Sequence, residues 1–317
     1  MADSKAKMAA IKARLAIPVM AAPMFLVSGT DSVVAACEAG VIGSLPTLNA
    51  RTLEILDGWM ADISTCLAEA EKANPGRVAP WAANLIAHRS NPRVQEELEL
   101  ILKYKPPIVV VAWAKPGPIV DAIHSYGGLV FADVNTVEYA RKSVDAGVDG
   151  LILVCAGAGG HTGELSPFAF VPAVREFFDG PLGVGGGIVD GYGVRAVEVL
   201  GADFANLGTR FIATSECRVD EEYKRMLVEC ESRDIITTAF FTGVSANYLV
   251  PSIVRSGLDP EEIREGKAAI DVGSGGTKAW KDVWSGGQGV FATKQISTTA
   301  EIVAELAEEY HKARELP

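Results

Sequence analysis

Several features that would classify this protein quickly are missing from its sequence. The 317 residues include five cysteines, an odd number without a CxxC pair, which predicts free thiols in a reducing, cytoplasmic compartment. No apolar run is as long as a transmembrane helix, and no His, Cys or carboxylate residues cluster with metal-ligand spacing. We therefore expect a soluble protein without a metal centre.

Basic charge is also scarce. Lys and Arg number 29 against 40 Asp and Glu, which gives a formal net charge of −11. Such a surface repels phosphate backbones and anionic membranes, so neither nucleic acid nor a membrane is an expected partner. A small anionic molecule could still bind through backbone N–H groups. The sequence leaves the oligomeric state open, and a homo-oligomer is one alternative.

Three common catalytic motifs do not occur either. The chain has no GxSxG nucleophile turn, and no GxGxxG motif follows a strand in register. Residues 273–278 resemble a phosphate-binding P-loop, but their spacing is wrong. These absences argue against a serine hydrolase, a dinucleotide-binding fold and a P-loop nucleotide hydrolase.

The sequence does contain a regular series of short apolar runs separated by helical patterns. Continuous apolar runs are typical of parallel strands that are covered on both faces. Eight strand–helix units in series predict an α/β fold of the (β/α)8, or TIM, barrel type. The predicted strands are Pro18–Met24, Val41–Leu45, Val78–Asn84, Ile108–Trp113, Leu129–Asp133, Leu151–Val154, Leu182–Val184 and Phe204–Leu207.

The first of these runs has an alternative interpretation. Four basic residues between positions 5 and 14 precede the apolar stretch 15–27, as in a secretory signal peptide. However, Pro18 and Pro23 interrupt the stretch, and no small-residue cleavage site follows it. A first barrel strand is the favoured interpretation.

The pattern changes in residues 232–296. Short helical pieces alternate there with Gly- and Ser-rich loops, and five aromatic residues gather: Phe240, Phe241, Tyr248, Trp280 and Trp284. We expect an inserted, mostly helical cap that covers the barrel mouth and binds the substrate. The barrel itself would comprise residues 1–231 and 297–317, with Thr298–Arg314 as a closing amphipathic helix. A packing subdomain without ligand contact is the alternative.

Two glycine-rich turns follow the seventh and eighth predicted strands. In (β/α)8 barrels these two loops often form a phosphate site, because glycines let the backbone N–H groups approach the anion. The first turn supplies Gly185, Gly186 and Gly187, and the second runs from Ala205 to Thr209. Tight strand-to-helix turns without a ligand are the alternative interpretation.

A histidine flanked by glycines follows the sixth strand. His161 lies in the run Gly157–Gly163, where little side-chain crowding limits its access to a ligand. Imidazole is well suited to proton transfer near neutral pH, so His161 is the candidate catalytic residue. A structural loop histidine is the alternative. Cys155 lies just before this run, and it is either a candidate nucleophile or an ordinary core thiol.

Together these motifs resemble the nitronate monooxygenases, formerly called 2-nitropropane dioxygenases. The resemblance extends from about Pro18 to about Phe291. FMN-dependent enoyl reductases share the Gly-Gly-His-x-Gly motif, so it is less specific for one reaction. The residues that carry the resemblance are Ala22-Pro23-Met24, Asn84, Ala158–Gly163, Gly185–Ile188, Gly208–Phe211 and Gly287-Gln288-Gly289.

The resemblance implies an FMN that lies across the C-terminal mouth of the barrel. Its phosphate would be held by Gly187, Asn206, Leu207, Gly208 and Thr209, with Pro23, Met24 and Asn84 beside the isoalloxazine ring. Gly159 would approach the flavin through its backbone, His161 would be the active-site histidine, and Gln288 would come near from the final segment. The implied reaction is the oxidation of an alkyl nitronate by O2 to a carbonyl compound and nitrite.

Three positions depart from the pattern of these relatives. Val154 and Gly157 stand where many members have Gln and Glu, and Asp133 stands where some have a basic residue. A polar contact to the flavin is therefore lost or moved. Two alternatives stay open: an FMN-dependent enoyl-type reductase that uses NAD(P)H, and a flavin-free, phosphate-binding lyase, isomerase or ligand-binding protein.

Overall fold

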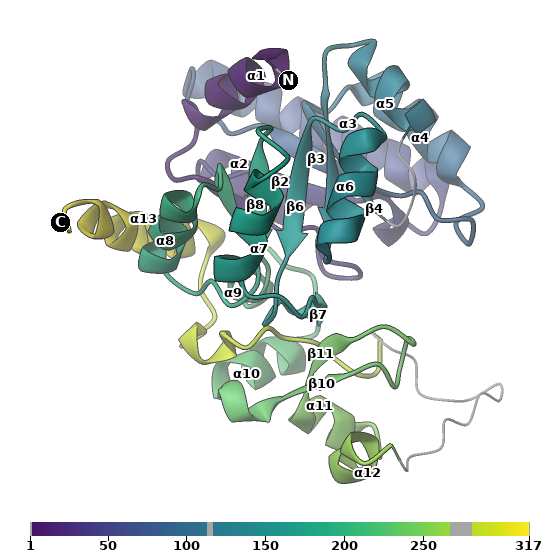
Figure 1. Ribbon diagram of the computed structural model, residues 1–317, viewed down its shortest axis with the longest axis vertical. Helices are drawn as coiled ribbons and strands as arrows, with labels where there is room; N and C mark the ends of the chain where they lie inside the picture. Colours follow the sequence, from purple (N-terminus) through teal and green to yellow (C-terminus); the bar gives the residue numbers. More distant parts are fainter. Residues whose placement is uncertain (1, 113–116, 267–280, 317) are drawn as a thin grey trace.

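Eight parallel strands form a barrel at the centre of the computed structural model, which describes residues 2–112, 117–266 and 281–316 (Figure 1). Their order is β1-β9-β8-β6-β5-β4-β3-β2. Hydrogen bonds from Ala21 N to Ile42 O (2.8 Å) and from Ile42 N to Val19 O (3.0 Å) connect the two ends. The strands are β1 (Val19–Ala21), β2 (Gly43–Pro46), β3 (Trp81–Ile86), β4 (Ile108–Ala112), β5 (Leu129–Val134), β6 (Gly150–Val154), β8 (Leu182–Gly185) and β9 (Phe204–Leu207).

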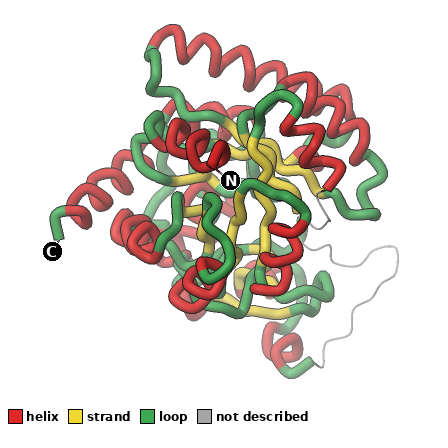
Figure 2. The backbone as a smooth tube through the Cα atoms, turned by 45° about the horizontal axis from the view of Figure 1, so that its top comes forward, coloured by secondary structure: helices red, strands yellow, loops and turns green. Residues whose placement is uncertain are grey.

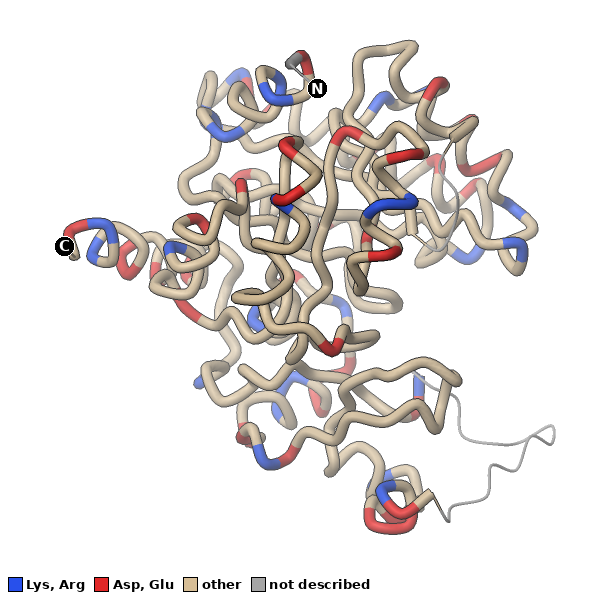
Figure 3. The backbone as a smooth tube through the Cα atoms, viewed as in Figure 1, with Lys and Arg blue, Asp and Glu red and all other residues tan. Residues whose placement is uncertain are grey.

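The predicted (β/α)8 barrel is thus confirmed, and each predicted strand is present. Trp113, the predicted last residue of the fourth strand, lies outside the described residues. Helices surround the strands, as Figure 2 shows, and most acidic and basic residues lie on these helices and the outer loops (Figure 3). The helices are α2 (Thr30–Glu38), α3 (Leu53–Ala73), α4 (Val94–Tyr104), α5 (Gly117–His124), α6 (Val137–Asp145), α7 (Pro167–Arg175), α8 (Gly191–Leu200) and α13 (Thr299–Arg314).

The alternation of side chains along each strand divides the core into two parts. One set of side chains fills the interior of the barrel, and the other packs between the strands and the surrounding helices. The interior set is Met20, Ile42, Ala82, Ile108, Val110, Leu129, Phe131, Ile152 and Phe204. Phe131 and Phe204 meet edge to face at 5.7 Å between ring centroids. The barrel is therefore a packed core and not a pore.

The N-terminal basic segment forms α1 (Ala2–Lys12), which lies at the end of the barrel opposite residues 232–296 (Figure 1). Met8, 1% exposed, belongs to the same cluster as the interior side chains and closes this end. The segment that resembles a signal peptide is thus packed into the barrel. Among the described residues, no helix is both long and apolar enough to cross a membrane.

Residues 232–296 contain short helices and two strands that the sequence did not predict. Strands β10 (Ile235–Thr238) and β11 (Ala246–Leu249) are antiparallel, and β11 also pairs with β7 (Gly160–His161). The helical elements are α11 (Val250–Arg255), α12 (Pro260–Arg264) and the 3-10 turns η2 (Ser232–Asp234) and η3 (Val290–Ala292). Trp280 of the expected aromatic group lies outside the described residues. A sheet therefore links this region to the loop after β6.

The closure of the barrel floor by Met8 leads to a stability prediction. We expect Met8→Ala to lower the free energy of unfolding by about 2–4 kcal/mol, because it leaves a cavity in the interior core. Lys5→Ala, on the exposed side of α1, should change it by less than about 0.5 kcal/mol. Urea unfolding followed by circular dichroism measures both. Equal stability of the two variants would contradict this role of Met8.

Candidate active site

The turn after β8 combines a packed glycine with an open one. Gly186 and Gly187 have φ angles of 130° and 68°, a backbone conformation that favours glycine. A Cβ atom on Gly186 would lie 2.8 Å from the carbonyl oxygens of Cys155 and Ala156, whereas one on Gly187 would meet no atom within 4 Å. Gly186 is required for packing, and Gly187 presents its backbone to open space.

The turn after β9 brings a hydroxyl group to the same end of the barrel. Thr209 Oγ1 accepts a 2.9 Å hydrogen bond from the backbone N–H of Gly287, which leaves the hydroxyl proton for another acceptor. A Cβ atom on Gly208 would lie 3.4 Å from Met24 Sδ, so this turn approaches the end of β1. The side chain of Leu207 points the other way, into the core outside the barrel. Only its backbone can take part in a site at the mouth.

Polar side chains form a layer directly above the apolar interior. Each stands two positions after an inward-facing residue: Ser44 after Ile42, Asn84 after Ala82, Asp133 after Phe131 and Asn206 after Phe204. Because side chains alternate along a strand, all four point into the barrel. Ser44 Oγ, Asp133 Oδ1 and Asn206 Oδ1 are buried and have no hydrogen-bond partner among the described residues. Most buried polar atoms have partners, so this layer has the character of a ligand site.

Burial raises the pKa of one group at the mouth and lowers the pKa of another. Burial raises the pKa of Asp133 to about 7, so its carboxyl group holds a proton far above the usual range. Burial lowers the pKa of His161, so its imidazole is neutral near pH 7. Near neutral pH the mouth therefore offers a proton donor and a neutral base.

His161 is held by residues of the 232–296 region. It belongs to β7, opposite Ala246 of β11, and its Nε2 atom lies 3.3 Å from Thr242 Oγ1. The Thr242 hydroxyl also lies 3.1 Å from Val244 O, and the tautomer of the imidazole decides which of His161 and Thr242 donates to the other. Asn247, which is 1% exposed, donates a 2.7 Å hydrogen bond to Ala158 O in the same loop. The loop that carries the candidate catalytic residue is thus fixed from outside the barrel.

The turn that follows β1 and contains Pro23 and Met24 is fixed by one asparagine. Asn49 Nδ2 donates to Met24 O (2.9 Å) and to Ser28 O (2.8 Å), and its Oδ1 accepts from Leu26 N (2.8 Å). Leu26 has a φ angle of 61°, an uncommon conformation for a leucine. Such strain persists where surrounding contacts enforce it, and it is frequent at functional sites.

Gln288 occupies the space beside Gly157. Its backbone N–H donates a 3.0 Å hydrogen bond to Gly157 O, and a Cβ atom on Gly157 would lie 3.0 Å from Gln288 Oε1. A polar group therefore stands next to Gly157 although that residue has no side chain. Gly159 is similarly enclosed, since its Cβ atom would lie 2.9 Å from Gly287 N. Val154, which pairs with Gly185, adds no polar group.

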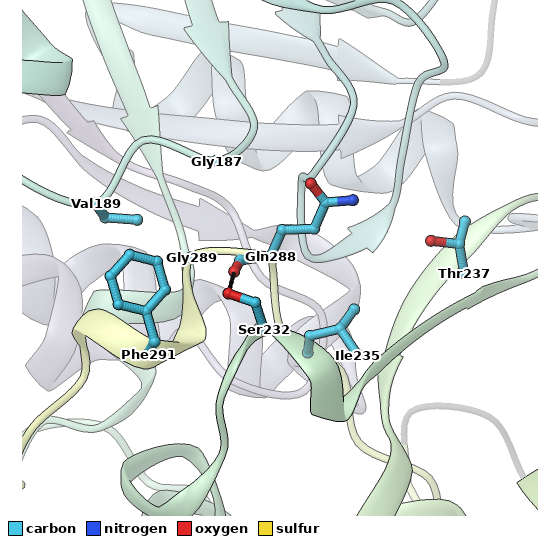
Figure 4. A pocket seen from close by; sticks show the side chains of 8 residues that line it. All are labelled: Gly187, Val189, Ser232, Ile235, Thr237, Gln288, Gly289 and Phe291. Carbon is cyan, nitrogen blue, oxygen red and sulfur yellow. Dashed lines mark hydrogen bonds between the residues drawn. The ribbon is translucent and has the colours of Figure 1, made fainter.

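An open cavity of about 380 Å³ lies between the turn after β8 and two segments, residues 232–237 and 288–291 (Figure 4). In Figure 4 the Gln288 side chain extends from the C-terminal segment toward the barrel loops. The hydroxyl of Ser232 donates to Gln288 O, which links the η2 turn to this segment. The cavity is lined by Gly187, Val189, Ser232, Ile235, Thr237, Gln288, Gly289 and Phe291.

The surroundings of Cys155 argue against the catalytic role suggested for it by its place in the sequence. Cys155 is fully buried, its thiol faces Leu153 O, and burial raises its pKa to about 12. A thiol in this environment is not ionised at neutral pH and is a core residue, not a nucleophile. All five cysteines are free, as predicted.

Three residues of the site were not predicted from the sequence: Ser44, Thr242 and Asn247. Ser44 could have been noticed, because a polar residue at an inward position near a strand end is unusual. The roles of Thr242 and Asn247 depend on the pairing of β11 with β7, for which the sequence carries no local signal.

The residues at the mouth have the donors and the space that a phosphorylated flavin, the cofactor implied by the resemblance, would need. The open backbone of Gly187 and the Thr209 hydroxyl offer donors for a phosphate group. The unpartnered atoms of Ser44, Asp133 and Asn206 offer polar contacts to a heterocycle above the apolar interior. In the described part of the chain, no three His, Cys, Asp or Glu side chains lie together in a group that could hold a metal ion.

Comparison with known proteins places these observations in a family. The nitronate monooxygenase family model matches residues 6–309. A nitronate monooxygenase of Paraburkholderia phytofirmans is 28% identical, over 94% of this chain and 93% of that protein.

Two solved structures share the fold. A nitroalkane oxidase from Streptomyces ansochromogenes superimposes with a TM-score of 0.75 at 23% identity, over 96% of this chain and 99% of that chain. The enoyl reductase domain of MlnA from Bacillus amyloliquefaciens gives a TM-score of 0.63 at 14% identity, over 81% and 67% of the two chains. Because the family model spans nearly the whole sequence, the chain belongs to the nitronate monooxygenase family and is a flavin-dependent oxidoreductase.

Proposed function

We propose that this protein binds FMN and oxidises alkyl nitronates with O2 to a carbonyl compound and nitrite. The observation that carries the proposal is the meeting of His161, the Gly187 turn and the unpartnered polar layer at one barrel mouth. Family membership supports the same chemistry. Bound FMN would supply the redox chemistry, and the residues of the chain would bind, orient and protect the reactants.

The proposed FMN contacts follow from what each residue presents at the mouth. Gly187, Gly208 and Thr209 would hold the phosphate through backbone N–H groups and a hydroxyl, and the unpartnered amide oxygen of Asn206 would accept a hydrogen bond from a donor group elsewhere on the cofactor. Met24 and Pro23, in the turn after β1, and Asn84, within β3, would border the ring system. Gly185 and Gly186 would act by allowing the close packing of the turn.

His161 would act on the substrate as a neutral imidazole. Its lowered pKa suits it to accept a proton from a neutral nitroalkane or to donate a hydrogen bond to a nitronate oxygen. We assign residues 232–296 to substrate binding, because β11 and Thr242 hold His161 from that side. Covering the mouth would exclude water from the reaction.

A second candidate function is the reduction of an activated C=C bond with NAD(P)H. The shared fold with an enoyl reductase domain favours this alternative. Anaerobic addition of NADH or NADPH to the yellow protein distinguishes the two functions, since bleaching of the flavin would support the reductase. Nitrite release from a primary nitronate in air without nicotinamide would support the monooxygenase. A colourless protein that takes up no FMN would contradict both.

The open backbone at Gly187 leads to a cofactor prediction. We expect Gly187→Ala to weaken FMN binding by at least about tenfold, because its Cβ would enter the space where the phosphate approaches. Alanine at a positive φ angle also costs about 1–2 kcal/mol of stability. Gly76→Ala is the matched control, since Gly76 has a φ angle of 75°, equally open space and a place in the turn between α3 and β3. Equal FMN affinity of the two variants, titrated by flavin fluorescence, would count against the phosphate site.

The position of His161 leads to a prediction about catalysis. We expect His161→Ala to lower the rate of nitrite release by about 10²- to 10⁴-fold, the usual contribution of a positioned acid or base. His124→Ala is the control, because His124 is exposed and pairs with Asp149 at a distance of 2.7 Å. Nitrite is measured after adding ethyl nitronate in air, with FMN content determined for each variant. Turnover of His161→Ala at the parent rate would remove the proposed role.

A further inference from the structure

One buried arginine contacts the turn that follows β8. Arg210 belongs to the short helix α9 (Thr209–Ile212) and is 7% exposed. Its Nη1 atom donates a 2.9 Å hydrogen bond to Val189 O, and its Nη2 atom donates one of 2.9 Å to Glu305 Oε2 of α13. Arginine is rarely buried to this extent without a partner, and here the partners are one backbone carbonyl and one carboxylate.

The carbonyl that Arg210 holds belongs to the wall of the cavity in Figure 4. Gly187 and Val189 both line this cavity of about 380 Å³. Two residues of chain span at most about 7 Å, so the guanidinium group lies near the open backbone of Gly187. Arg210 also follows Thr209 directly in the chain. Its side chain thus connects the two turns to which the phosphate group of the cofactor is assigned.

Three carboxylate groups lie around the same turn. Asp190 and Glu309 accept hydrogen bonds of 2.7 and 2.9 Å from backbone N–H groups at the start of α8, and Glu305 pairs with Arg210. All three would repel a phosphate group. Arg210 is the only described Lys or Arg whose side chain hydrogen-bonds to residues 185–189. An anion at this turn therefore depends on Arg210 for positive charge.

We propose that Arg210 selects the phosphate-bearing form of the flavin, as a positioning residue that holds the Val189 carbonyl and as the counter-charge of the phosphate group. The inference rests on the proposed cofactor site and extends it from backbone donors to a buried charge. A guanidinium group shielded from water acts on an anion over several ångströms with little screening by salt.

A purely structural brace is the alternative, and the two roles differ in how they respond to the ligand. A brace stabilises the turn for any flavin, so its loss weakens the binding of FMN and of riboflavin alike. A counter-charge acts on the phosphate group, which riboflavin lacks. The ratio of the two dissociation constants therefore isolates the effect of the charge.

The test measures the dissociation constants of FMN and riboflavin for the flavin-free form of the whole chain, by quenching of flavin fluorescence. We expect Arg210→Gln to lower the preference for FMN over riboflavin by about 10- to 100-fold, the effect of one charge at about 8 Å in a protein interior. Arg210→Lys keeps the charge and should keep most of the preference. Glu305→Gln removes the carboxylate that pairs with Arg210 and should raise the preference by about threefold.

Arg175 is the matched control, because it braces the opposite end of the barrel. Its Nη1 atom donates to Phe178 O (3.1 Å) and Gly180 O (2.6 Å), and its Nη2 atom lies 3.5 Å from Asp203 Oδ2. Gly180 and Asp203 precede β8 and β9, far from the mouth. We expect Arg175→Gln to lower the melting temperature, because these carbonyl groups lose their donors, and to leave the FMN preference unchanged.

The outcomes separate this inference from the proposed function. Equal losses of FMN and riboflavin affinity in Arg210→Gln, or a preference that does not rise in Glu305→Gln, would make Arg210 a structural brace only. The second measurement does not depend on whether Arg210→Gln folds. A protein that prefers FMN through Arg210 but releases no nitrite from nitronates would overturn the proposed reaction and leave this role in place.

Discussion

Closure of the parallel barrel is the constraint on which the rest of this structure depends. Once the Val19–Ala21 strand bonds to Ile42, every second side chain of eight strands must point to a common axis. Below the mouth these positions are apolar and close-packed around Phe131 and Phe204. At the next inward position, four of the strands carry a polar side chain: Ser44, Asn84, Asp133 and Asn206. The same alternation thus produces a dry core and, directly above it, a layer that can recognise a ligand.

The sequence predicted those parts of the molecule that depend on local patterns. Eight apolar runs predicted eight strands, and the glycines at 185–187 and 208 indicated where the backbone turns at the ends of β8 and β9. The environment of Asp133 was not predictable, because its pKa depends on burial by neighbouring strands. Nor was the position of Gln288 beside Gly157, which joins residues 131 positions apart, or the short β7–β11 pairing, which has no amphipathic period.

Burial shifts the pKa values of two side chains at the mouth in opposite directions, upward for Asp133 and downward for His161. His161 is attached to the sheet of residues 232–296, whereas Asp133 belongs to the rigid barrel. A displacement of β11 would move the imidazole and leave the carboxyl group in place. The position of His161 relative to the barrel therefore depends on the packing of β10, β11 and α11 through Tyr248, Ile253 and their neighbours. Core substitutions there should affect catalysis without touching a reactant.

The crossing of the mouth by residues 286–288 has a consequence for how the protein is made. The backbone N–H of Gly287 bonds to Thr209 and that of Gln288 to Gly157, so the last part of the chain completes a site whose other walls are formed much earlier in synthesis. A ribosome that has released only the eight barrel strands has produced an unfinished pocket. Any cofactor contact that needs residues 286–288 can therefore form only after all eight barrel strands have been made.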